Sequence, residues 1–157
     1  MLGLKGITKK VSNLNQMENL YHIRERFSII HDNKKIGIQM KWEGKREKPP
    51  MLMLPALSTI SRSDEWQHFK AIVTDKYQLI TIDWPGFGES DKIDIHYSGT
   101  VLQKTLKKAI KVIQSKNNRK LTIIAAGHSA SVVLTLKDKY INTIKQVVLI
   151  APTWRGP

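Results

Sequence analysis

The sequence contains no cysteine, which excludes disulfides, thiolate metal sites and cysteine nucleophiles. It also has no apolar run near the roughly 18 residues that a membrane-spanning helix requires. The first residues mix lysines with polar residues and lack the apolar stretch of a signal peptide. We therefore expect a soluble intracellular protein without a membrane span. Its 157 residues, 41% of them hydrophobic, are enough for one domain with a sizeable core.

Acidic residues are scarce, because 13 Asp and Glu stand against 26 Lys and Arg and leave a formal net charge of +13. Most of the basic residues are lysines spread along the whole chain, whereas arginine is the better reader of phosphates and bases. Isoleucine and asparagine are also frequent, and AT-rich codons favour both of them together with lysine. The pattern favours a solvated surface and no nucleic-acid partner. A functional basic face is the alternative.

Apolar patterns divide the chain into strands and helices. Residues 27–31 and 35–42 flank turn residues and predict an antiparallel hairpin. Short continuous apolar runs, typical of strands covered on both faces, follow at 51–54, 79–82, 121–126 and 147–151. Helical patterns separate these runs, beginning at residues 63–65, around residue 102 and at about residue 130, the last extending to about residue 140. The second helix is amphipathic. Its apolar stripe consists of Leu102, Leu106, Ile110 and Ile113. Its solvent-exposed side carries Lys104, Lys107, Lys108 and Lys111.

This order of elements predicts an α/β fold of three layers, α/β/α. The sheet is mostly parallel and carries the antiparallel hairpin at its N-terminal side. We expect residues 1–20 to form a loose arm and residues 21–157 to form one domain. In an open parallel sheet, ligands bind beyond the carboxyl ends of the strands. The loops after the apolar runs are therefore the places to look for a site.

The strongest chemical signal is the segment Ala-Gly-His-Ser-Ala-Ser at 126–131, between a predicted strand and a predicted helix. In the pattern G-x-S-x-G, a sharp strand-to-helix turn lifts a serine hydroxyl above the sheet and points a helix N-terminus at a developing oxyanion. Gly127 supplies the first glycine, and Ser131 replaces the second. We predict that Ser129 stands at the apex of such a turn and acts as a nucleophile. The alternative is that Ser129 only caps the helix.

Two further loops extend the pattern: DWPGFGESD at 83–91 and LPALSTIS at 54–61. With the serine segment, in this order, they resemble the α/β-hydrolase superfamily over residues 25–157. The resemblance implies that the backbone amides of Ala130 and Leu57 form an oxyanion hole, with Pro55-Ala56 standing where His-Gly is usual. It also implies that Asp83 organises its loop rather than serving as the triad acid, and that no metal or organic cofactor takes part.

More narrowly, LPALSTISRSDEW, DWPGFGES and the terminal APTWRGP are similar to a group of α/β hydrolases of cyanobacteria and plastids. This similarity implies a location in the plastid (chloroplast) stroma or in a bacterial cytoplasm. Members of the group often have an altered serine segment.

A serine hydrolase also needs a general base and an acid, and in this superfamily both follow the serine along the chain. After Ser129 the sequence offers only Asp138, expected on the solvent side of its helix, and no histidine. The run at 147–151 would also leave an apolar edge strand uncovered. We therefore expect an incomplete α/β-hydrolase fold with strands 1 to 6, lacking the C-terminal strands and cap, and needing the missing C-terminal half or a partner strand.

These observations favour the N-terminal fragment of a serine-type hydrolase that is inactive as it stands. Completed, it would act on an ester or similar acyl bond of a small molecule, with Ser129 as nucleophile. One alternative is a non-catalytic α/β-hydrolase-fold protein that binds a ligand or partner through the same loops. A third is a basic adaptor for nucleic acid or an anionic membrane.

Overall fold

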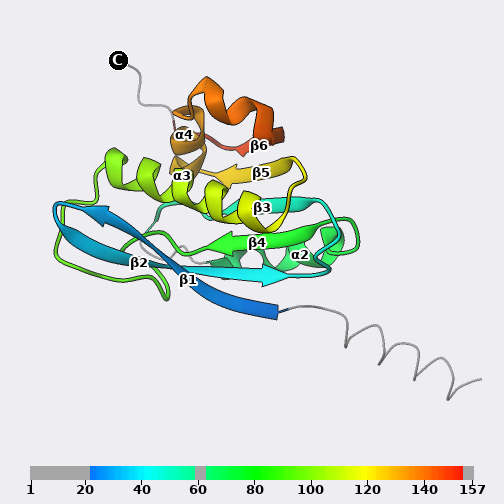
Figure 1. The fold of residues 1–157 in the computed structure, drawn as a ribbon, viewed down its shortest axis with the longest axis horizontal. Helices are drawn as coiled ribbons and strands as arrows, with labels where there is room; N and C mark the ends of the chain where they lie inside the picture. Colours follow the sequence, from blue (N-terminus) through cyan, green and yellow to red (C-terminus); the bar gives the residue numbers. More distant parts are fainter. Residues whose placement is uncertain (1–21, 59–62, 154–157) are drawn as a thin grey trace, which may run out of the picture.

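The computed structural model describes residues 22–58 and 63–153, so the predicted N-terminal arm lies outside the described residues (Figure 1). A single sheet runs through the molecule, with helices on both of its faces. The strands are β1 (His22–His31), β2 (Lys34–Glu43), β3 (Pro50–Leu54), β4 (Gln78–Ile82), β5 (Leu121–Ala126) and β6 (Ile144–Ile150). The helices are η1 (Ser63–Trp66), α2 (Gln67–Val73), α3 (Gly99–Lys116), α4 (His128–Leu134) and η2 (Asp138–Thr143).

The predicted hairpin is confirmed. β1 and β2 pair antiparallel from His22 opposite Glu43 to His31 opposite Lys34. Asp32 and Asn33 form the two-residue turn with φ of 48° and 58°. Two consecutive left-handed residues match the twist of a hairpin, and Asp and Asn tolerate this conformation better than most side chains do.

The sheet has the strand order β1-β2-β4-β3-β5-β6. β2 pairs antiparallel with β4, whereas β4, β3, β5 and β6 are mutually parallel. The chain passes from β3 to β4 on one side and then to β5 on the other side of β3. The carboxyl ends of the strands beside such a reversal are where ligands bind in open parallel sheets.

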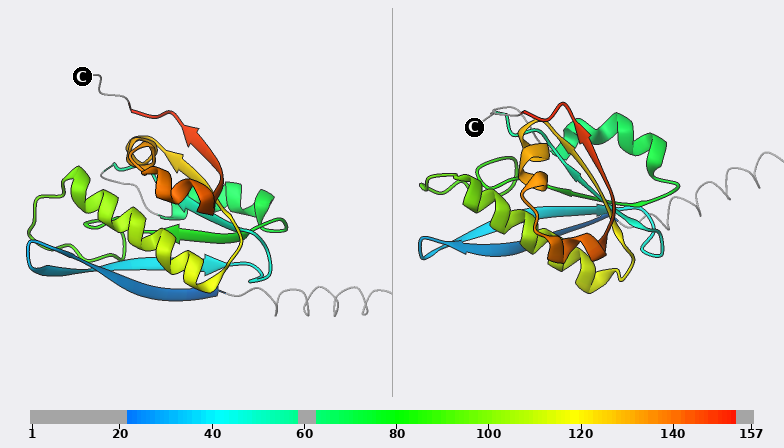
Figure 2. Two further views of the ribbon diagram at one scale, coloured as in Figure 1. Left: turned by 45° about the horizontal axis from the view of Figure 1, so that its top comes forward. Right: turned by 90° about the horizontal axis from the view of Figure 1, so that it is seen from above.

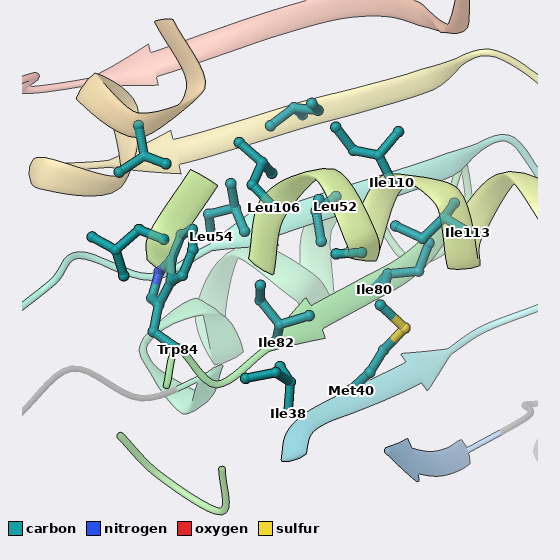
Figure 3. Packing of buried hydrophobic residues seen from close by; sticks show 14 of the residues in the cluster. Ile38, Met40, Leu52, Leu54, Ile80, Ile82, Trp84, Leu106, Ile110 and Ile113 are labelled. Atoms are coloured by element: carbon teal, nitrogen blue, oxygen red, sulfur yellow. The ribbon is translucent and has the colours of Figure 1, made fainter. Parts of the chain in front are cut away.

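Two helical layers cover the sheet, with α2 on one face and α3 and α4 on the other (Figure 2). The apolar stripe that was predicted for the second helix is buried along α3, and it packs against the central strands around Leu52, Ile80 and Ile82 (Figure 3). Beneath α2, Met53 and Trp66 belong to a second apolar cluster. The predicted three-layer α/β architecture is confirmed.

The third helix differs from its prediction of 130 to 140. α4 begins at His128, because Gly127 makes the turn from the strand, and it ends at Leu134. The amides of Thr135 and Leu136 bond to carbonyls three residues back, the tighter spacing in which helices often terminate. Asp138 is exposed as predicted, but it opens the separate helix η2.

β6 lies at the edge of the sheet and pairs only with β5 among the described strands. Val147 and Ile150 keep 40% and 43% of their surface exposed, so the edge is apolar as well as open. Among the described residues, none of the helices combines the length and the apolarity needed to cross a membrane.

Candidate active site

The loop after β4 is organised around Asp83, as predicted. The Asp83 carboxylate is buried and accepts a hydrogen bond from the amide of Glu89 at 3.0 Å. The Ser90 hydroxyl donates to the Asp83 carbonyl at 2.6 Å and accepts from the Gln39 amide at 2.9 Å. Asp91 accepts from the amide of Gly37 at 2.6 Å. The loop is therefore fastened both to itself and to the neighbouring strand β2.

Gly88 is the tightest position of this loop. Its φ is +50°, a conformation that residues with a side chain rarely adopt. A methyl group at this position would collide with the carboxyl group of Asp83. Glycine is required here by both backbone conformation and space.

The strand-to-helix turn after β5 is centred on Gly127. β5 ends at Ala126 and α4 begins at His128, so Gly127 alone makes the turn, with φ 54° and ψ −129°. Its amide donates to the Ile150 carbonyl at 2.9 Å. A Cβ built on Gly127 would lie 3.2 Å from the Cβ of Ala56. The apex of the turn therefore faces the loop after β3.

Ser129 does not stand at this apex, which corrects the predicted position of its hydroxyl. It lies in the first turn of α4 and has no exposed surface. Its Oγ donates to the Pro55 carbonyl and accepts a hydrogen bond of 2.8 Å from the indole Nε1 of Trp84. Trp84 is itself 99% buried and also donates to the Pro55 carbonyl at 3.3 Å.

This three-residue group joins the loops after β3 and β4 to helix α4. Figure 3 shows Trp84 beside Leu54, with its indole nitrogen on the side where α4 begins. The abrupt turn is present as predicted, but it is displaced by two residues, and the serine hydroxyl points into the protein because a helical turn carries it there.

One of the two predicted oxyanion-hole amides already has a partner. The Ala130 amide donates to the Gly127 carbonyl at 3.1 Å, which occupies it within the turn. In the loop after β3, the Ala56 amide donates to the Glu65 carboxylate at 2.6 Å. Leu57 is half-buried, and its side chain packs against the core. The Ala130 amide is thus engaged within the turn, and the role predicted for the Leu57 amide stays a prediction.

No described histidine or carboxylate shares a hydrogen bond with Ser129. His128 is the nearest along the chain, and it is exposed, with Nδ1 3.4 Å from the Thr153 hydroxyl. The described residues also contain no group of three His, Asp or Glu side chains that could hold a metal ion. Around Ser129 the described site therefore consists of backbone groups, small side chains and one buried indole, and the Glu65 carboxylate is held by the Ala56 amide.

The sequence matches no protein-family model and no curated protein. The backbone does resemble solved structures. A serine hydrolase involved in carbazole degradation superimposes with a TM-score of 0.68 and 18% identity over 85% of this chain. A thioesterase domain from the curacin biosynthetic pathway gives 0.69 and 17% over 86%. A haloalkane dehalogenase from Agrobacterium tumefaciens gives 0.68 and 19% over 84%.

These structures share the α/β-hydrolase fold, and the chain has this fold in incomplete form. The matched regions make up 50%, 48% and 42% of the three solved chains, so this chain spans about half of their length. At identities below one fifth, the likeness concerns the fold and not the activity. The predicted fold class is confirmed.

Proposed function

We propose that this chain belongs to a non-catalytic α/β-hydrolase-fold protein that binds a small ligand or partner through the loops at the carboxyl ends of its strands. The observation that carries the proposal is the residue at the apex of the strand-to-helix turn. In the nucleophile elbow the attacking side chain stands on that strained residue. Here the residue is Gly127, with φ 54° and no side chain.

The small residues around the turn also support Gly127 as the residue at the nucleophile position. An elbow needs small side chains two positions before and two positions after the nucleophile, because the turn passes close to its neighbours. Counted from Gly127, these positions are Ala125 and Ser129, and both are fully buried. When Gly127 is taken as the nucleophile position, Ser129 is the small residue two positions after it. Its hydroxyl then packs in the interior and forms hydrogen bonds.

The contacts of Ser129 support a structural role. Its hydroxyl is satisfied as donor by Pro55 and as acceptor by Trp84, and no polar atom of it faces solvent. Attack on a substrate would require this hydroxyl to leave both partners and expose itself. The Pro55 carbonyl and the Trp84 N–H group would then each lose a hydrogen bond while remaining buried, which costs free energy.

The proposal includes a partner for β6. Its open apolar edge and the half-length match to hydrolase-fold structures both support further strands, supplied by a C-terminal half or by another chain. The narrower resemblance to proteins of cyanobacteria and plastids, and the implied plastid or bacterial location, remain predictions from the sequence.

A serine hydrolase acting on an ester or similar acyl bond is the second candidate. One observation favours it: Ser129 lies against the loop after β3, the loop that supplies an oxyanion-hole amide in such enzymes. In this candidate, completion of the fold would rotate the hydroxyl out of its contacts. The base and acid would come from the completing part.

Labelling with a fluorophosphonate probe separates the two candidates. We expect no labelling of the chain, or of any longer natural form that contains it, because the serine hydroxyl is buried and the apex has no side chain. Ser131→Ala is the matched control, since Ser131 lies on the same helix and is partly exposed. Labelling that survives Ser131→Ala and disappears in Ser129→Ala would establish the hydrolase candidate instead.

The Ser129→Ala variant also has an expected effect on stability. Loss of the hydrogen bonds to Pro55 and from Trp84 should lower the free energy of unfolding by about 1–2 kcal/mol, measured by denaturant titration. A catalytic serine behaves differently, because active sites trade stability for function and lose little or gain when the reactive group is removed. An unchanged or raised free energy of unfolding would therefore count against the structural role.

A further inference from the structure

The outer side of α3 carries a lysine stripe, defined as Lys104, Lys107, Lys108 and Lys111. These positions follow the spacing i, i+3, i+4 and i+7, so they share one face of the helix. The opposite face holds the buried apolar residues that pack on the sheet. α3 forms part of the outer layer of the molecule (Figure 2), so the stripe faces away from the core.

The stripe lacks the ion pairs that other lysines of the chain make. Elsewhere, Lys41 pairs with Glu89, Lys70 with Glu43, and Lys116 with Glu25. In contrast, α3 contains no acidic residue. Within the described part of the chain, Lys107, Lys108 and Lys111 make no ion pair or hydrogen bond through their side chains. Lys104 donates to the backbone carbonyl of Ile30 at 3.2 Å and also lies 3.4 Å from Nδ1 of His31, and it makes no ion pair with a described carboxylate.

Four like charges at these spacings destabilise a helix by a few tenths of a kcal/mol for each neighbouring pair. Within the described part of the chain none of the four lysines makes an ion pair that would offset this repulsion, whereas an anionic surface would. Two further lysines, Lys137 and Lys139, are exposed beside η2, which follows α4 in the same layer as α3.

We propose that the lysine stripe is a docking surface for an anionic membrane. The four lysines share one helix face over about 10 Å of helix length, so their flexible side chains can reach a flat surface together. Lysine acts as a point charge at such a surface, and each lysine near acidic headgroups contributes about 1 kcal/mol to the free energy of membrane binding.

The residue types favour lipid over nucleic acid. Neither α3 nor α4 nor η2 contains an arginine, the side chain that reads phosphates and guanine bases by two parallel hydrogen bonds. The same elements expose no Trp, Tyr or Phe ring on which a base could stack, because Tyr140 is buried. The surface thus offers charge alone, which is what a headgroup layer recognises.

Co-sedimentation with vesicles tests the proposal. The 157-residue chain should sediment with vesicles of equal parts phosphatidylglycerol and phosphatidylcholine, and not with pure phosphatidylcholine. The triple variant Lys107→Gln, Lys108→Gln, Lys111→Gln should bind the acidic vesicles roughly 100-fold more weakly. Added salt should weaken binding of the unchanged chain, because surface charges are screened.

The matched control changes three lysines outside α3, Lys45→Gln, Lys76→Gln and Lys92→Gln, and removes the same charge. Circular dichroism should show both triple variants folded, and the α3 variant should be at least as stable as the unchanged chain. Equal loss of vesicle binding in the two triple variants would overturn the proposal, because net charge alone would then explain it. Failure to bind acidic vesicles, or binding to duplex DNA alone, would overturn it as well.

Discussion

Replacement of Trp84 by alanine is expected to lower the free energy of unfolding by about 3–5 kcal/mol. The indole is almost completely buried among the core residues, and its truncation would leave a cavity beneath the loops after β3 and β4. It would also remove the donor that satisfies the Ser129 hydroxyl. Since small domains are stable by only about 5–15 kcal/mol, this variant should unfold at much lower denaturant concentration.

Trp84→Phe provides the control for this prediction. Phenylalanine keeps most of the apolar volume and removes only the N–H group, so we expect a loss of about 1–2 kcal/mol. The unfolding should be followed by far-ultraviolet circular dichroism, because both variants alter tryptophan fluorescence. A loss below 1 kcal/mol in Trp84→Ala would show that the indole does not hold the loops together.

Gly88→Ala should produce the second large effect, a loss of about 3 kcal/mol or more. The added methyl group would meet the buried Asp83 carboxyl group, and alanine would have to adopt a φ of +50°. The expected consequence is a displaced loop, in which Asp83 no longer accepts from the Glu89 amide. Reduced thermal stability, measured by circular dichroism, would report it.

Gly99→Ala is the matched substitution. A Cβ at Gly99 meets nothing within 4 Å, and the residue opens helix α3 without a left-handed backbone. Alanine should be neutral or slightly stabilising there, because it restricts the unfolded chain more than glycine does. Equal destabilisation by the two substitutions would contradict the special role of Gly88.

Most of the fold could be predicted from the sequence. The continuous apolar runs and the amphipathic stripe of α3 report burial directly, and burial is what places a strand or helix in a layered fold. Asp32 and Asn33 likewise indicated the hairpin turn, because few residue types other than glycine accept a left-handed backbone conformation. The end of α4 was missed, since a helix that tightens into shorter hydrogen bonds leaves no mark in the apolar pattern.

The position of the strand-to-helix turn was harder to predict, because the pattern of small residues fits both Gly127 and Ser129, two positions apart. Both Gly127 and Ser129 have small residues on either side at the required spacing. The pattern G-x-S-x-G favours Ser129, because Gly127 then supplies the first glycine. β5 ends at Ala126, as its apolar run predicted, and the structure places the turn at the next residue, Gly127. The partnership of Ser129 with Trp84 spans 45 positions, and no local pattern reports it.

The bonds that tie the loop after β4 to β2 have a consequence for how the molecule is assembled. Gln39 meets Ser90, and Gly37 meets Asp91, across more than fifty positions of the chain. A polypeptide that has not yet closed this long loop lacks the contacts that fix the segment after β4, however well its separate helices have formed. The loop after β4 should consequently take its final form only after β2 has met it, and local melting of the hairpin should release it.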